Sequence, residues 1–328
     1  MAEGLQILDT RYAGEAASYM IQRATIGLDT INEGVVKIQD GIKYQFTIPR
    51  MTVTGILAKR AATPTSIGTI TVDGNLLAPL NYMCYTEWNP RDLETYWYAY
   101  QLPTRLIDAV LPQTFEGYLI DTYIKQLNQQ NEYMIWRGRT AYDPANGGLD
   151  PTTKGAPASD SAYMYYNGFM QLLLNDAGTI QIGSPVALTT SNIVATMNTI
   201  YSAIPQEILN NPNLRFHMNR NTWRLYSIAL TSNQFKDNQT TQATEFAFKG
   251  YEIVALGGMP DNTIIACVST NDEKSALWLG LNSTEDTNAV KIMPVENKSE
   301  LYFIKILMKA AVQFSFSQEI VLYSTITA

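Results

Sequence analysis

The sequence predicts a protein of the α+β class, because three long stretches of it favour different secondary structures. Near the C-terminus, at residues 304–316, apolar residues alternate with polar ones, which is the pattern of a half-buried strand. Residues 114–137 instead place apolar side chains three or four positions apart, which predicts the longest helix of the chain. Residues 43–88 predict a long two-stranded ribbon with a polar tip, which needs a packing partner to be stable.

The C-terminal strand is expected to bury one face and to carry polar residues on the other. Lys305 and Lys309 belong to the polar face, so the strand suits a sheet packed on a helix or on another subunit. The residues expected on the buried face are Ile304, Ile306, Met308, Ala310, Val312, Phe314 and Phe316.

Other elements follow from periodicity and from turn residues. The helix at 114–137, about 30 Å long, is expected to end before Gly138. The ribbon is expected to hold an outgoing strand from Tyr44 to Val53, a return strand over 67–72 and a turn at Asp73-Gly74. Further helices are expected at 11–25, 89–103, 161–175, 193–203 and 219–230, and further strands at 76–85, 214–218, 248–254 and 263–268.

Composition excludes several classes of protein. The chain has 328 residues, 46% of them hydrophobic and 16% charged, so it is not disordered as a whole. Its net charge of -7 argues against tight electrostatic binding of nucleic acid. Acidic residues outnumber basic ones between the aromatic residues of 82–100, so these aromatics are expected to pack in the protein rather than to stack on bases. No apolar run reaches the length of a membrane span. Cys84 and Cys267 are expected to be buried free thiols rather than a disulfide.

The residues that carry enzyme chemistry are scarce. His217 is the only histidine, so a hydrolase would have to use it, but it lies between Phe216 and Met218 in an expected strand and is better interpreted as a core or surface strand residue. No group of residues has the spacing of zinc ligands. Gly257-Gly258 is interpreted as a tight connection, because no helix follows it to bind phosphate. We therefore predict no catalytic, cofactor-binding or metal-binding residue and no cofactor.

Several stretches, in their order along the chain, resemble the major capsid proteins of tailed bacteriophages, which share the Hong Kong 97-type fold. The resemblance covers nearly the whole chain. It is carried by the long helix closing on Trp136-Arg137-Gly138, Asn167-Gly168-Phe169, Leu188-Thr189-Thr190-Ser191-Asn192, Pro212 through Tyr226, Lys249 through Ile253, Gly258-Met259-Pro260-Asp261, Ala311 through Phe314 and Glu319 through Tyr323.

The resemblance implies a division of the chain into five parts. These are an N-terminal arm (1–42), an extended β-hairpin loop (43–88), a peripheral domain (89–185) with a spine helix at 115–137, an axial domain (186–300), and a C-terminal strand (301–328) returning to the peripheral domain. The loop would lie across a neighbouring subunit, and the arm would reach another.

The resemblance also implies a structural role without enzyme activity. Members assemble as hexamers and pentamers into an icosahedral shell that encloses double-stranded DNA without sequence-specific binding. The expected partners are other copies of the chain, a portal, a separate scaffolding protein and decoration proteins, with no membrane. Assembly is expected in the host bacterial cytoplasm, and the protein is expected in the virion. The alternatives are an encapsulin-type nanocompartment shell around an enzyme cargo and, from another class, the hydrolase that uses His217.

Two features of the family bear on particular residues. Many relatives carry a scaffolding segment that a protease removes, whereas this sequence has only about forty residues before the ribbon. A separate scaffold is therefore expected, and a cleaved N-terminus in particles would contradict it. Some relatives also join subunits by a Lys–Asn bond, for which Lys59 is the candidate lysine, although no asparagine or assisting acid can be matched to it. Boiled, reduced particles that run only as monomers would exclude that bond.

Overall fold

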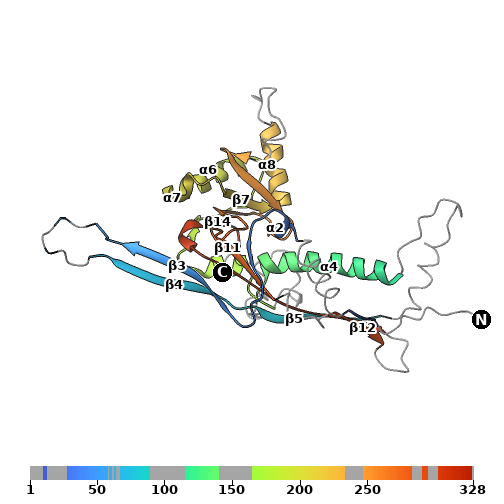
Figure 1. Cartoon of the computed structure of the whole chain (residues 1–328). Coiled ribbons are helices and arrows are strands. Elements are labelled where there is room, and N and C mark those ends of the chain that lie inside the picture. The colour runs from blue at the N-terminus through green and yellow to red at the C-terminus, as the bar shows by residue number, and fades with distance from the viewer. Residues whose placement is uncertain are drawn as a thin grey trace, which may run out of the picture.

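The described part of the chain contains two six-stranded sheets, one long helix and a two-stranded hairpin that projects from the body (Figure 1). In the computed structural model, the fold is mixed helix and strand, which confirms the predicted α+β class. The structure describes residues 10–12, 28–57, 59–60, 63, 67–88, 115–139, 165–232, 247–282, 290–294 and 302–326. The helix expected at 89–103 lies outside these residues.

The first sheet is built on the long C-terminal strand β13 (Tyr302–Phe314). Its strand order is β1-β12-β13-β11-β2, and β5 also pairs with β13. All pairs of this sheet are antiparallel except β11 with β2. The other strands are β1 (Thr10–Tyr12), β2 (Lys37–Gln39), β5 (Leu80–Trp88), β11 (Leu277–Leu281) and β12 (Val290–Pro294).

Helix α4 (Phe115–Arg137) crosses one face of the first sheet. Its Ile124 and Leu127 pack against Ile304, Ile306 and Met308 of β13. These three residues, with Ala310, Val312 and Phe314, are at most 6% exposed. The alternation predicted for the strand is therefore confirmed as far as its end at Phe314.

The second sheet has the order β6-β14-β10-β7-β9-β8 and packs on helices at one face. Its strands are β6 (Ile180–Gln181), β7 (Leu214–Asn219), β8 (Ala247–Phe248), β9 (Tyr251–Leu256), β10 (Thr263–Val268) and β14 (Val321–Ser324). The helices are α6 (Ile193–Ala203), α7 (Gln206–Leu209) and α8 (Arg220–Ser232). The opposite face contributes Val254, Ile265 and Leu322 to a core shared with α4 and with α5 (Phe169–Asn175).

The chain changes sheets at points other than those expected. Strands β11 and β12 lie inside the expected axial segment (186–300), but both pair with β13 in the first sheet. After the short helix η4 (Ser317–Glu319), strand β14 pairs with β10 and so belongs to the second sheet. The C-terminal segment expected at 301–328 thus contains two strands, β13 in the first sheet and β14 in the second. The position of β14 depends on long-range pairing: it is fully buried against β10, and its local sequence does not indicate which strand it pairs with.

The helix expected at 161–175 begins only at Phe169. The chain before it passes very close to the end of α4, where the Gly168 N–H donates to the Gly138 carbonyl at 2.7 Å. A Cβ at Gly138 would lie 2.4 Å from the carbonyl oxygen of Tyr166. Glycine at the end of α4 is thus required by backbone contact.

Near the N-terminus, Arg11 and Tyr12 belong to strand β1, so the helix expected at 11–25 is wrong at its start, and the rest of it lies outside the described residues. The Cys84 and Cys267 thiols are free, Cys267 fully buried and Cys84 half-buried. Among the described residues, no helix is long and apolar enough to cross a membrane.

Candidate assembly surfaces

The projecting hairpin consists of β3 (Phe46–Thr54) and β4 (Thr69–Leu77), paired along their whole length. The turn expected at Asp73-Gly74 is wrong, because both residues lie inside β4. Gly74 faces Pro49, and a Cβ on it would come within 2.2 Å of the Ile48 carbonyl oxygen. The glycine therefore lets the two strands approach closely. Strand structure is interrupted instead at residues 78–79, between β4 and β5.

This register gives the hairpin one polar and one apolar face, since paired residues share a face and successive residues alternate. On the polar face, Arg50 binds Asp73 through a hydrogen-bonded ion pair, and Thr52 lies opposite Thr71. The apolar face carries the cross-strand pairs Met51–Val72 and Val53–Ile70, with Leu76 nearer the body.

The apolar face is open to solvent in the single subunit. Met51 is 63% exposed, Val72 72% and Ile70 67%. Val53, Ile56, Leu57, Ile67 and Leu76 are exposed as well. A row of large apolar side chains on a slender ribbon marks an interaction surface, because such a ribbon gains stability only by burying that face.

The root of the hairpin is fixed in the body. Phe46, Ile48 and Leu77 pack with Trp278 and Ala311, and the rings of Phe46 and Trp278 are stacked with centroids 6.2 Å apart. The Asn75 amide donates to the Phe314 carbonyl at 2.8 Å, and the Gln313 amide to the Leu76 carbonyl at 3.1 Å. The body therefore sets the direction in which the ribbon projects.

The tip begins where strand pairing stops, at Thr54 and Thr69. Gly55 and Gly68 face each other there with positive φ angles of 66° and 91°, a conformation that favours glycine. Lys59 lies in this tip and is exposed, as expected. Whether it is cross-linked to another subunit stays a prediction.

Exposed apolar side chains also lie on the face of the first sheet that α4 does not cover, beside Lys305, which pairs with Tyr85. Met83 of β5 faces Leu307 of β13 and is 53% exposed. Beside this pair, the rings of Tyr85 and Phe303 lie with centroids 5.6 Å apart. We call these four residues the sheet patch.

His217 lies at the centre of β7 and is 0% exposed. Neither ring nitrogen has a hydrogen-bond partner, and burial, helped by the nearby Arg215, lowers its pKa from 6.5 to about 3. The interpretation of His217 as a core residue is supported, because its ring is fully buried and neither ring nitrogen is hydrogen-bonded to a group that could exchange a proton with it. In the described part of the chain, no three metal-binding side chains gather.

Replacing His217 with leucine is expected to make the protein more acid-resistant. The folded-state pKa of His217 lies below its ordinary value, so the unfolded chain takes up a proton below pH 6.5 that the folded chain refuses. At pH 5 this lowers the free energy of unfolding by about 2 kcal/mol, which the variant would not lose. Denaturant unfolding at pH 7 and pH 5 measures the difference; equal losses in both proteins would contradict the account.

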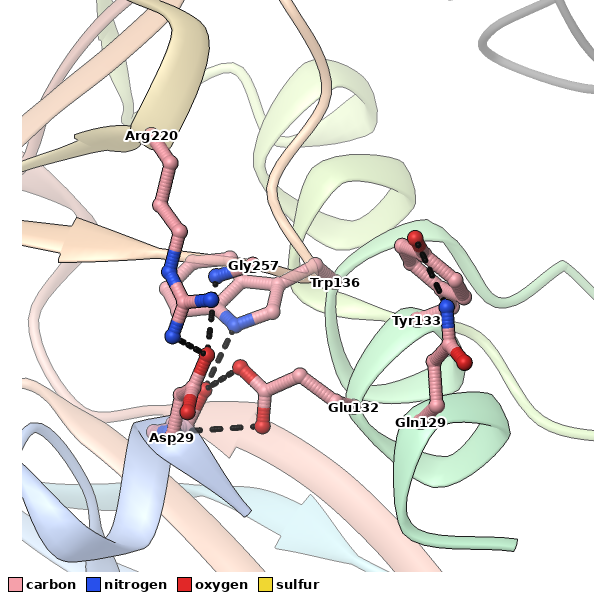
Figure 2. Close-up of polar contacts among 8 residues, drawn as sticks. Asp29, Gln129, Glu132, Tyr133, Trp136, Arg220 and Gly257 are labelled. Carbon is pink, nitrogen blue, oxygen red and sulfur yellow. Dashed lines mark hydrogen bonds and ion pairs between the residues drawn. The ribbon is translucent and has the colours of Figure 1, made fainter. Parts of the chain in front are cut away.

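A buried polar cluster joins α4 to the N-terminal helix α2 (Asp29–Asn32) and to the turn after β9 (Figure 2). Glu132 of α4 accepts hydrogen bonds from the Thr30 N–H and hydroxyl, at 3.2 and 2.5 Å. The Trp136 indole N–H donates to the same Thr30 hydroxyl at 2.7 Å. Asp29 pairs with Arg220 at 2.6 Å and also accepts from the Gly257 N–H.

The two glycines of that turn form a tight connection, as expected, and the structure gives the reason. A Cβ at Gly258 would lie 2.4 Å from the Glu132 carbonyl oxygen. Arg137 also binds this turn, donating hydrogen bonds to the carbonyls of Gly258 and Met259 at 2.8 and 2.7 Å. The turn is thus a docking point for α4.

The sequence showed the ribbon but neither the polar cluster nor the sheet patch. Thr30 and Glu132 are 102 positions apart, so nothing local connects them. The apolar face of the hairpin could have been found from the alternation Met51, Val53 and Ile70, Val72, had Asp73-Gly74 not been interpreted as a turn.

Comparison with known proteins places the chain by its fold. No protein-family model and no curated protein sequence matches it. Several solved structures match the chain over nearly its whole length. A satellite phage P4 procapsid chain is 10% identical with a TM-score of 0.56, and the match covers 94% of this chain and 99% of that one.

Two further solved structures agree. The capsid of Myoviridae phage XM1 is 11% identical with a TM-score of 0.55, covering 98% of this chain and 96% of that one. A Mycobacterium phage Che8 chain is 11% identical with a TM-score of 0.52, covering 100% and 97%. The fold expected from the sequence is confirmed over nearly the whole chain.

Proposed function

We propose that this chain, which has the Hong Kong 97-type fold of tailed-bacteriophage major capsid proteins, is the structural subunit of an icosahedral phage shell. The observation that carries the proposal is the exposed apolar face of the β3–β4 hairpin, held away from the body by a fixed root. A surface of this kind requires an occupant, and in a shell every copy offers the same surfaces to its neighbours.

In this proposal the hairpin of one copy lies across the next, and its apolar face covers the sheet patch of that copy. Met51 and Val72 would then meet apolar side chains such as Met83 and Leu307, so both surfaces lose their contact with water together. Of the arm expected at 1–42, residues 28–42 pack in the core of their own subunit, with Val35 and Val36 fully buried, so this part does not reach a further copy. Hexamers and pentamers built in this way would close the shell.

The chain would act as a building block rather than a catalyst and would be found in the virion, after assembly in the host cytoplasm. Its net charge of -7 suits a wall that encloses double-stranded DNA without binding it tightly. A separate scaffolding protein, a portal and decoration proteins are the partners proposed beside the chain itself.

Electron microscopy of the full-length chain, expressed alone and with a candidate scaffold from the same genome, tests this function. Large angular shells whose uniform size requires the scaffold are expected. Small uniform shells formed by the chain alone would favour an encapsulin-type compartment. A monomer in both preparations would contradict the proposal.

A further inference from the structure

The carboxylate of Glu132 binds helix α2 to helix α4, next to the turn between β9 and β10. It bonds Thr30 of α2 through both oxygens, and Thr30 is itself held by the Trp136 indole. The turn between β9 and β10 rests on the backbone of the same residue, against the Glu132 carbonyl. The N-terminal helix and the turn of the second sheet therefore both contact α4 at Glu132 (Figure 2).

The hydrogen-bond donors around Glu132 match an ionised carboxylate. The Thr30 hydroxyl accepts from Trp136 and so directs its own proton to one Glu132 oxygen, while the Thr30 N–H requires the other oxygen as an acceptor. The bonds from Thr30 therefore offset part of the cost of a charge on Glu132. However, Glu132 is only 5% exposed, and burying its charge is costly.

Burial and the hydrogen bonds from Thr30 act on the pKa of Glu132 in opposite directions. Burial is the largest influence on Glu132; it outweighs the two bonds from Thr30 and raises the pKa from 4.5 to about 7, with a smaller contribution from Asp29. A cleft of about 350 Å³, lined by Glu132, Asp29, Lys125 and Arg220, opens beside the carboxyl and offers protons a path from solvent.

Other charged and titratable groups surround the cluster. Asp29 on α2 is paired with Arg220 on α8, and Arg137 on α4 is bound to carbonyls of the turn. Lys125 and Tyr133 line the cleft from α4 itself, and Tyr166, before α5, is buried with its pKa well above the ordinary value. Among these neighbours, burial raises the pKa of Glu132 itself to about 7.

We propose that Glu132 is a proton-controlled latch, which packs α2 on α4 more tightly when its carboxyl is neutral than when it is ionised, because burying the charge costs more than the two bonds from Thr30 return. Because the folded-state pKa is raised, the stability contributed by Glu132 is full below pH 4.5 and is lost as the pH rises to about 7. The latch is a property of the subunit and does not depend on shell formation.

Hydrogen exchange of residues 28–36 in the full-length chain, corrected for the intrinsic effect of pH, tests the latch. We expect protection of this segment to fall about tenfold between pH 5.5 and 8 in the natural chain. Glu132→Gln, which cannot ionise, should show no such fall. Glu273→Gln removes the same charge from an exposed loop and should behave like the natural chain.

Thr30→Val provides a second test, independent of how well Glu132→Gln folds. It keeps the side-chain volume but removes the hydroxyl whose bond favours the ionised form, so the midpoint of the exchange transition should move up by about one pH unit. A natural chain without the transition, a transition that persists in Glu132→Gln, or a midpoint unmoved by Thr30→Val would each overturn the proposal.

Discussion

Replacing Met51 with glutamate is expected to reduce the assembled fraction at least tenfold while leaving the subunit folded. Met51 is 63% exposed on the apolar face of the hairpin, so the change costs the isolated subunit little, within about 0.5 kcal/mol. In an assembled shell the same position would be buried, and a carboxylate there would replace a favourable apolar contact of about 2 kcal/mol with an unpaired charge. Sedimentation of matched preparations measures the loss.

Thr52→Glu is the matched control for this change. Thr52 is the next residue of β3, is also exposed, and lies on the polar face of the ribbon opposite Thr71. It receives the same charge one residue nearer the tip. Assembly of Thr52→Glu with failure of Met51→Glu would assign the contact to one face of the ribbon. Normal assembly of both variants would show that the apolar face is not an interface.

Replacing Gly258 with alanine should be among the most destabilising single changes in the body of the protein. The added Cβ would lie 2.4 Å from the Glu132 carbonyl oxygen, which α4 holds in place, so the turn would have to leave the helix. The Arg137 bonds to the Gly258 and Met259 carbonyls would weaken with it. A loss of about 3 kcal/mol in the free energy of unfolding is expected by denaturant titration.

Gly183→Ala separates this contact from the general effect of removing a glycine. A Cβ at Gly183 would meet nothing within 4 Å, so alanine there should change the free energy of unfolding by no more than about 0.5 kcal/mol, or raise it slightly. If Gly258→Ala were as stable as Gly183→Ala, the turn would not be docked on α4 as the structure describes.

Elements with a strong local pattern were predicted well. The helix that apolar spacing predicts at 114–137 spans 115–137, and the helix expected at 193–203 has those bounds, because apolar spacing and a terminal glycine or asparagine are local signals. The buried face of β13 was also predicted residue by residue up to Phe314.

Contacts between distant segments could not be predicted. Asp73-Gly74 carries the composition of a turn, yet pairing with Arg50 and Pro49 keeps it in a strand. Glu132 looks like one more polar residue of a long helix until α2 covers it with Thr30. Likewise, nothing in 321–324 indicates that this strand pairs with β10 rather than extending the sheet of β13.

A reconstruction of the assembled particle by cryo-electron microscopy tests the central proposal most directly. We predict that Met51, Val53, Ile70 and Val72 of each copy are buried against an adjacent copy, with the sheet patch of that copy beneath them. A shell in which this face of the hairpin remains in solvent, held together by other contacts, would contradict the proposal.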